Sequence, residues 1–132
     1  MTRDEIRGIP VFAGLSDAGV DHLAARAAEI EVAADQVLAL QGDTGSGMFV
    51  VLEGTVTVEL RGGPVELGPG EPVGELALIA PDLHRIARVR AKTPARCLGL
   101  SREDFLELLE SEPSLALALL RTLAARLAAM PS

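Results

Sequence analysis

One stretch combines a glycine turn, an acid and a nearby arginine, which together could bind a phosphorylated sugar. It runs Gly74-Glu75-Leu76-Ala77-Leu78-Ile79, and Arg85-Ile86-Ala87-Arg88 follows. Free backbone N–H groups at a helix start attract an anion, and a guanidinium binds phosphate oxygens through two parallel hydrogen bonds. A carboxylate there suits a sugar hydroxyl, as acids do for ribose in dinucleotide sites. The stretch suggests a small phosphorylated ribose, although alone it fits an ordinary apolar turn and a surface arginine equally well.

The rest of the chain lacks the residue patterns of catalysis or metal binding. Its single cysteine, Cys97, lies in a strand-like run where a buried, inert thiol is expected. The two histidines, His22 and His84, show neither HxH nor HExxH spacing, so we expect no metal site. No nucleophile–base pair accompanies Glu75 and Arg85, and we therefore expect binding without turnover, not an enzyme.

Composition indicates one soluble, cytoplasmic domain. The 132 residues suffice for a single core, and 48% of them are hydrophobic. The longest apolar run, Leu115 to Leu120, is far shorter than the ~20 residues that span a bilayer. The acidic amino terminus lacks the apolar core of a secretion signal. A net charge of -7 disfavours the broad basic surface of a nucleic-acid-binding protein.

Helical patterns flank a β region. Residues from about 3 to 29 are predicted to form N-terminal helices, with Ser16 or Asp17 as a helix cap. Between about 30 and 100 the apolar residues alternate, and nine of the thirteen glycines fall between Gly42 and Gly74. Short strands joined by glycine-rich turns indicate an antiparallel sandwich or jelly roll. The Gly74 stretch is the one predicted helical interruption there, which favours a site over a scaffold.

The segment after Arg85 carries alternating charges. Val89 and Ala91 are predicted on one strand face, and the cations lie on the other: Arg88, Arg90 and Lys92. We interpret these cations as a solvated outer face. The stretch from His84 to Arg96 nevertheless holds five of the twelve Lys and Arg residues and no acid. A local positive field would help an anionic ligand to approach.

The residues from about 102 to 130 return to helix. Ser101 to Asp104 fits a capping-box signature, and Pro113 opens a last helix that is expected to reach Met130 before Pro131. Because leucines also lie around its sides, we expect this helix to pack on the barrel and on a partner helix. Its predicted apolar row steps by four and three: Ala116, Leu120, Leu123, Leu127 and Met130.

Several motifs in one order resemble the cyclic nucleotide-binding domain, the module of the catabolite activator protein, protein kinase A regulatory subunits and cyclic-nucleotide-gated channels. They are Gly42-Asp43, Met48 to Val58, Gly68-Pro69-Gly70-Glu71, Gly74 to Ile79, Arg85-Ile86-Ala87 and Val89 to Thr93. The similarity covers about Pro10 to Met130. It implies a single domain over residues 1–132, mainly β with flanking helices. Its core would be an antiparallel, jelly-roll-like β-roll with N-terminal helices, a short phosphate-binding-cassette helix and two C-terminal helices.

The resemblance also implies roles for individual residues. Gly74 would open the cassette, Glu75 would bond the ribose 2′-hydroxyl, and Arg85 would pair with the charged oxygen of the cyclic phosphate. Backbone N–H groups of four residues would complete the cradle: Leu76, Ala77, Ile86 and Ala87. The last helix would cover the purine through Leu123, Arg126, Leu127 and Met130, although at helical spacing these leucines also fit a core or a dimer interface.

Three features depart from the family pattern. Ile86 stands where many members have Ser, Thr or Ala, so a hydroxyl contact to phosphate is lost while the backbone N–H remains. Arg88 stands where the pattern has a Thr that helps to hold guanine in cGMP-preferring members, which favours cAMP over cGMP. The chain has no Trp or Tyr, and its three phenylalanines are poorly placed for a lid, so stacking of the purine on a ring is not expected.

Two functions follow as hypotheses. The favoured one is a stand-alone regulatory sensor that binds cAMP, or else cGMP, and signals by movement of its terminal helices. The alternative is a domain that has lost its ligand and serves as a dimerisation module. We expect a homodimer through the last helix, no DNA-binding motif, pore or kinase in this chain, and an effector that the sequence does not identify.

Overall fold

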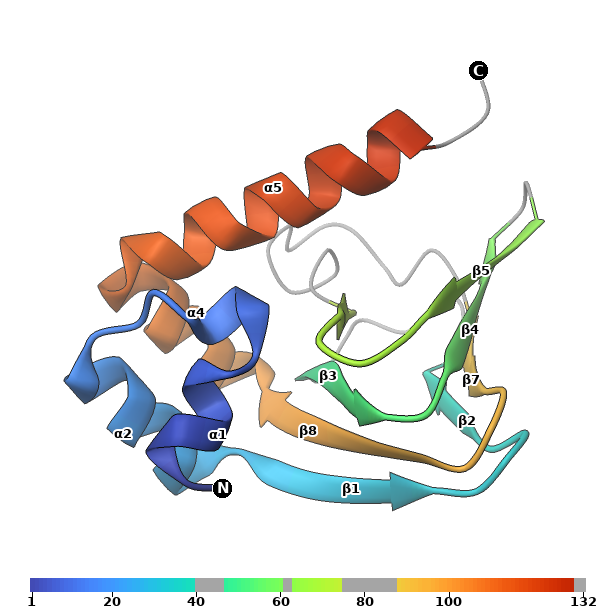
Figure 1. Ribbon diagram of the computed structural model, residues 1–132, viewed down its shortest axis with the longest axis horizontal. Coiled ribbons are helices and arrows are strands. Elements are labelled where there is room, and N and C mark those ends of the chain that lie inside the picture. The colour runs from blue at the N-terminus through green and yellow to red at the C-terminus, as the bar shows by residue number, and fades with distance from the viewer. Residues whose placement is uncertain (40–46, 61–62, 75–87, 130–132) are drawn as a thin grey trace. The chain divides into compact units, whose positions relative to one another are not determined.

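The computed structural model describes residues 1–39, 47–60, 63–74 and 88–129. The chain divides into a helical unit, Met1–Ala25 with Glu107–Ser132, and a β unit, Arg26–Leu106. The elements are α1 (Arg3–Arg7), η1 (Pro10–Phe12), α2 (Asp17–Arg26), β1 (Ala28–Val32), β2 (Val37–Ala39), β3 (Gly47–Glu53), β4 (Val56–Leu60), β5 (Gly63–Leu67), β6 (Pro72–Val73), β7 (Arg88–Ala91), β8 (Ala95–Ser101), α4 (Arg102–Ser111) and α5 (Pro113–Ala129). Figure 1 labels all of them except η1 and β6. The predicted class, mainly β with flanking helices, is confirmed.

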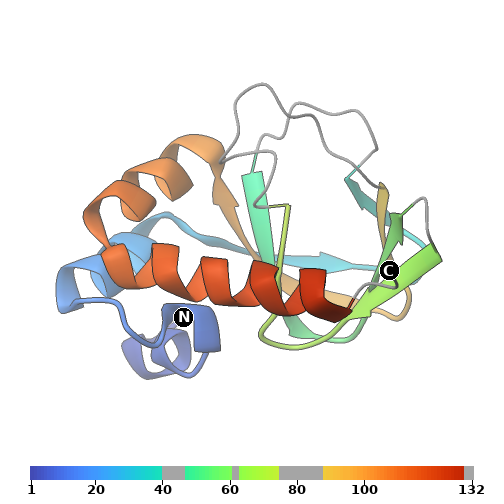
Figure 2. The ribbon, with the colours of Figure 1, turned by 90° about the horizontal axis from the view of Figure 1, so that it is seen from above.

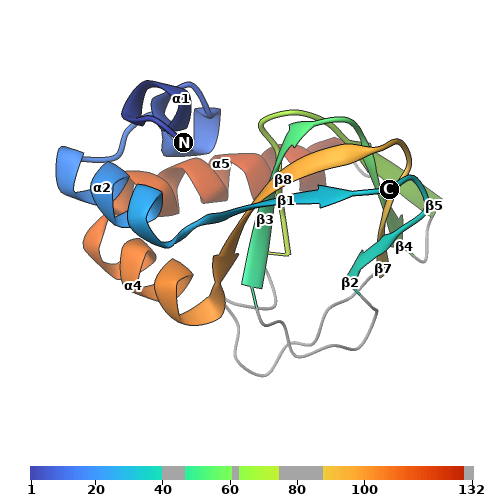
Figure 3. The ribbon, with the colours of Figure 1, turned by 90° about the horizontal axis from the view of Figure 1, so that it is seen from below.

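The β unit consists of two four-stranded antiparallel sheets. Their strand orders are β1-β8-β3-β6 and β2-β7-β4-β5, and Figure 3 shows the first three strands of one sheet side by side. The core lies between the sheets because apolar side chains alternate toward it from both. Its main cluster of buried residues contains Val51, Val73 and Cys97 from the first sheet and Val56, Leu67 and Val89 from the second.

Side-chain caps fix where the helices begin. In α1, Thr2 and Glu5 form a capping box, in which each side chain accepts the other's backbone N–H, at 3.2 and 3.1 Å. Ser16 and Ser101 cap α2 and α4 by accepting the N–H three residues on, at 3.1 and 3.2 Å. Each cap satisfies a backbone donor that the helix itself leaves unpaired. Ser16, not Asp17, is therefore the cap of α2.

The first boundary between helix and strand lies earlier than predicted. Helix α2 ends at Arg26 and β1 begins at Ala28, whereas the helical pattern was expected to continue to about residue 29. The cause is tertiary, because Ala28 and Glu29 already pair with Gly99 and Leu98 of β8. The ladder therefore overrides the local helical preference of these two residues.

Helix α5 buries a different face from the predicted one. It is one uninterrupted helix (Figure 2), and its fully buried residues are Leu115 and Leu119. Leu120 and Leu127 of the predicted row are 63% and 70% exposed. A helix that is apolar on nearly all sides carries no signal for the face that will be buried. Within the described ranges, no helix has the length and apolarity that crossing a membrane requires.

Candidate functional site

The predicted cassette begins at a glycine whose backbone only glycine adopts readily. Gly74 directly follows β6 and has φ +89°, in the left-handed region. The prediction of a glycine turn at this point is thus confirmed. Six predicted ligand-binding residues lie outside the described part of the chain: Glu75, Leu76, Ala77, Arg85, Ile86 and Ala87.

The two ends of the segment 75–87 belong to different sheets. Its entry follows β6, the outermost strand of the first sheet, whose Val73 pairs with Phe49 of β3. Its exit is Arg88, the first residue of β7, which is an inner strand of the second sheet. Both sheets therefore fix the ends of the segment that was predicted to bind phosphate.

The predicted alternation at the exit is confirmed. Val89 and Ala91 are buried, at 4% and 0% exposure, while Arg88 and Arg90 lie on the opposite face and both bind Glu59 of β4. The Arg88 Nε to Glu59 Oε2 and Arg90 Nη2 to Glu59 Oε1 distances are both 2.7 Å. The hydrogen bond from Arg88, together with the positive charges of Arg88 and Arg90, holds the pKa of the Glu59 carboxyl below its ordinary value.

These ion pairs decide between the two interpretations of the basic stretch. Lys92 pairs with Glu66 of β5, and Arg96 contacts Glu29 and Glu53 at 3.1 and 2.8 Å. The described cations of this stretch are thus matched by acids on other strands of the same sheets. Opposite charges at such distances largely cancel farther away, so these residues form a paired outer face and do not supply the positive field considered from the sequence.

An apolar surface that was not predicted as part of the site lies on the inner side of the β unit. Phe49, Leu38 and Val58 are only partly buried and pack against the main core cluster. Phe49 also lies opposite Val73, the residue before Gly74. From the sequence, Phe49 was part of the Met48 to Val58 motif and was expected to be a poor lid residue. Its position opposite Val73 could not be predicted, because strands β3 and β6 lie far apart in the chain and their register has no local signal.

The predicted lid residues belong to α5 in the helical unit. Leu123 and Arg126 are half-buried and Leu127 is exposed, while Met130 lies outside the described residues. These exposures neither assign nor exclude a lid, so the roles of the four residues remain predictions.

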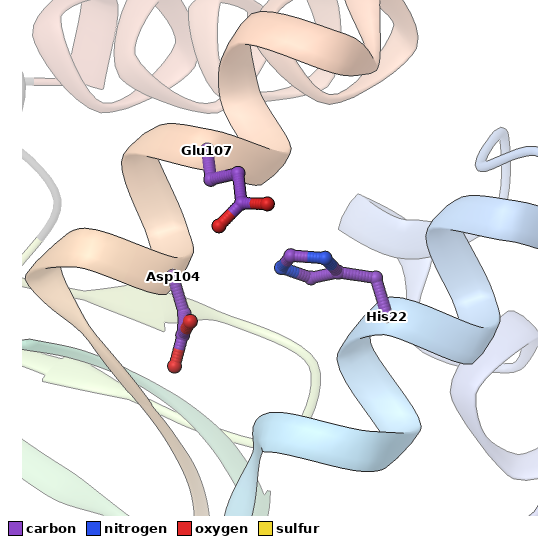
Figure 4. Close-up of side chains that lie close together, drawn as sticks. All are labelled: His22, Asp104 and Glu107. Atoms are coloured by element: carbon purple, nitrogen blue, oxygen red, sulfur yellow. The ribbon is translucent and has the colours of Figure 1, made fainter.

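Other titratable groups were also located. Cys97 is buried, as predicted, and burial raises the pKa of its thiol, which disfavours the reactive thiolate. In the helical unit, the half-buried His22 of α2 lies beside the exposed Glu107 of α4, with side-chain atoms within 4.8 Å (Figure 4). His22 therefore lies at the boundary between the buried and the exposed side of α2.

Comparison with known proteins gives a consistent assignment. The family model described as the cyclic nucleotide-binding domain matches residues 29–112. A cyclic nucleotide-gated potassium channel of Rhizobium etli is 36% identical over 117 residues, which are 89% of this chain and 33% of the channel. This chain thus spans about a third of that relative's length.

Two solved structures share the fold. The catabolite activator protein of Thermus thermophilus is 32% identical with a TM-score of 0.74, over 89% of this chain and 58% of that chain. The regulatory subunit of a cAMP-independent protein kinase A from Trypanosoma brucei is 28% identical with a TM-score of 0.81, over 90% of this chain and 43% of that chain. With the two-sheet β unit, the left-handed Gly74 and the match over residues 29–112, the chain belongs to the cyclic nucleotide-binding domain family.

Proposed function

We propose that this chain is a sensor that binds cAMP in preference to cGMP through the segment that follows Gly74. In this proposal Glu75 accepts the ribose 2′-hydroxyl, and Arg85 forms two hydrogen bonds to the cyclic phosphate. The observation that carries the assignment is the left-handed backbone of Gly74 directly before Glu75. This backbone turns the chain directly into the segment that carries Glu75 and Arg85. Binding proceeds without turnover. We also propose that this protein is cytoplasmic.

The inner apolar surface supplies a place for the base. Phe49, Leu38 and Val58 leave part of their side chains uncovered beside the core, and burial of apolar surface favours binding of a flat heterocycle. Arg88 supports the preference for cAMP, because Glu59 binds its guanidinium on the outer face. In that position Arg88 does not replace the threonine that contacts guanine in cGMP-preferring members of the family.

The output of the sensor is a change in its terminal helices. A ligand shifts such an equilibrium only by binding one helix arrangement better than another. The exposed leucines of α5, above all Leu120 and Leu127, fit an interface with a second copy of this chain. A homodimer through α5 is thus part of the proposal, and the effector belongs to a segment or protein of unknown identity.

A second candidate is a domain of the same fold that no longer responds to cyclic nucleotides. Ile86, which lacks the hydroxyl of many family members, favours it. The trypanosomal relative, whose kinase is described as cAMP-independent, is a second reason to test it. The presence of both Glu75 and Arg85 favours the first candidate.

Thermal unfolding with and without nucleotide separates the two candidates. At a ligand concentration about a hundred times Kd, binding to the folded state adds about 2.7 kcal/mol of stability. For a domain of this size, that raises Tm by several degrees. We expect a larger shift with cAMP than with cGMP. Unchanged melting at millimolar concentrations of both nucleotides would reject the first candidate.

Arg85→Lys tests the phosphate contact by isothermal titration. An ammonium cannot reproduce the planar, two-pronged guanidinium contact, so the affinity for cAMP should fall severely. Arg90→Lys is the matched control, because Arg90 lies on the outer face with Glu59. Equal affinities of the two variants would remove Arg85 from the site.

A further inference from the structure

One carboxylate, that of Glu112, joins the connection between α4 and α5 (the elbow) to the start of α2. We call its hydrogen bonds to Ser16 the clasp. Glu112, the residue between the two helices, accepts the backbone N–H of Ser16 at Oε1, 2.7 Å away, and the Ser16 hydroxyl at Oε2, 3.0 Å away. Ser16 Oγ in turn accepts the N–H of Gly19 at 3.1 Å. The acid thus binds the cap of α2, where the partial positive charge of a helix N-terminus favours an anion.

A glycine inside α2 makes room for this carboxylate. A Cβ atom on Gly19 would lie 2.5 Å from Glu112 Oε1, which is closer than two such atoms approach. Gly19 is the third residue of α2, where glycine disfavours helix relative to alanine. Glycine therefore stands at this position although it is a poorer helix former than alanine, because its missing side chain leaves the space that the Glu112 carboxylate fills.

A second polar contact joins the same two segments. The Ser114 hydroxyl donates to the carbonyl of Gly14 at 2.9 Å, and a Cβ on Gly14 would lie 3.0 Å from the Ser114 Cβ. On its other side this loop is bound by Arg7 of α1, whose Nη1 donates to the carbonyl of Leu15 at 2.9 Å. The loop before α2 is thus held by α1 and by the elbow.

We propose that Glu112 is a positioning residue that fixes the direction of α5 relative to α1 and α2. Helix α5 begins at Pro113, the next residue, so anchoring Glu112 anchors the first turn of the helix.

Distance measurement between two spin labels tests the clasp in the full chain without any ligand. The labels are attached at Ala24→Cys on α2 and Ala125→Cys on α5, both exposed, in a Cys97→Ala background, and read by double electron–electron resonance. Glu112→Ala should broaden the distance distribution and lower Tm by about 3–6 °C. Glu110→Ala, an exposed acid two residues earlier, is the matched control and should leave the distribution narrow.

A second variant, Gly19→Ala, disturbs the contact of Glu112 from the side of α2. Gly19→Ala improves helix propensity but its methyl group displaces the carboxylate, so the distribution should broaden although Glu112 is retained. A narrow distribution in both Glu112→Ala and Gly19→Ala would overturn the proposal, even if Tm fell. All of these measurements are made without nucleotide, so their outcome tests the clasp independently of the proposed function.

Discussion

Replacing Leu120 by alanine should weaken self-association of this chain without weakening its folded monomer. Helix α5 leaves three leucines uncovered, Leu117, Leu120 and Leu127, which are 48%, 63% and 70% exposed. With the exposed Ala124 they lie at spacings of three, four and three, the pattern of the a and d positions of a coiled coil. A second copy of α5 is the partner that such a row fits.

The size of the effect follows from the exposed fraction. Leucine to alanine removes about three methylene equivalents, each worth about 0.8 kcal/mol when buried. With 63% of Leu120 available for burial, each copy loses about 1.5 kcal/mol, and a symmetric dimer loses about 3 kcal/mol because the residue occurs twice. The dissociation constant should therefore rise roughly a hundredfold.

Sedimentation equilibrium over a wide range of protein concentrations measures this constant. Val65→Ala on β5 is the control, because Val65 is an apolar residue of 40% exposure that does not belong to the leucine row of α5, and its dimer should match that of the wild type. Chemical denaturation of dilute monomer should hardly distinguish Leu120→Ala from the wild type. A wild type that stays monomeric throughout, or an unaltered constant in Leu120→Ala, would refute the interface.

Three further predictions test the β unit. The depressed pKa of Glu59 means that this acid adds stability above its unfolded-state pKa, and that this contribution is lost as the pH falls through the lower folded-state pKa; Glu59→Gln should therefore flatten the acid side of a Tm–pH profile, and an unaltered acid slope would contradict the pairing. Phe105→Ala, at a site with 0% exposure, should cost about 3–5 kcal/mol in urea unfolding, and a loss below 1 kcal/mol would contradict its burial. Cys97 should react with a thiol reagent in urea but not in the native protein, since it is buried; rapid native labelling would show otherwise.

The strands could be predicted from the sequence because apolar and polar side chains alternate along them. The pairing of one strand with another could not be predicted. The segment from Arg88 to Lys92 alternates strictly in sequence, and β7 places Val89 and Ala91 in the core as expected. The pairing of Arg88 with Glu59 joins residues 29 positions apart. Sheet order and register depend on such distant contacts, which leave no periodic signal in either strand.

For helix α5, the apolar pattern predicts the element correctly but not the face that is buried. Its leucines predict a helix correctly, but they surround it so completely that the sequence offers two competing stripes. The structure buries Leu115 and Leu119 and exposes Leu120 and Leu127. Only the packing of the neighbouring helices selects between the stripes, so the face left for a partner could not be read from periodicity.

The position of Arg88 in the structure reduces the number of residues that argue against ligand binding. Two departures from the family pattern, Ile86 and Arg88, each count in favour of a domain that has lost its ligand. Arg88 begins a strand on which its neighbour Val89 is buried, and Glu59 holds its guanidinium on the outer face. In the proposed function, Arg88 therefore lacks the guanine contact of the family's threonine, but the binding of cAMP does not use that contact. Within this sequence, the case for lost binding therefore rests on Ile86, which lacks a hydroxyl but keeps the backbone N–H that a phosphate oxygen needs.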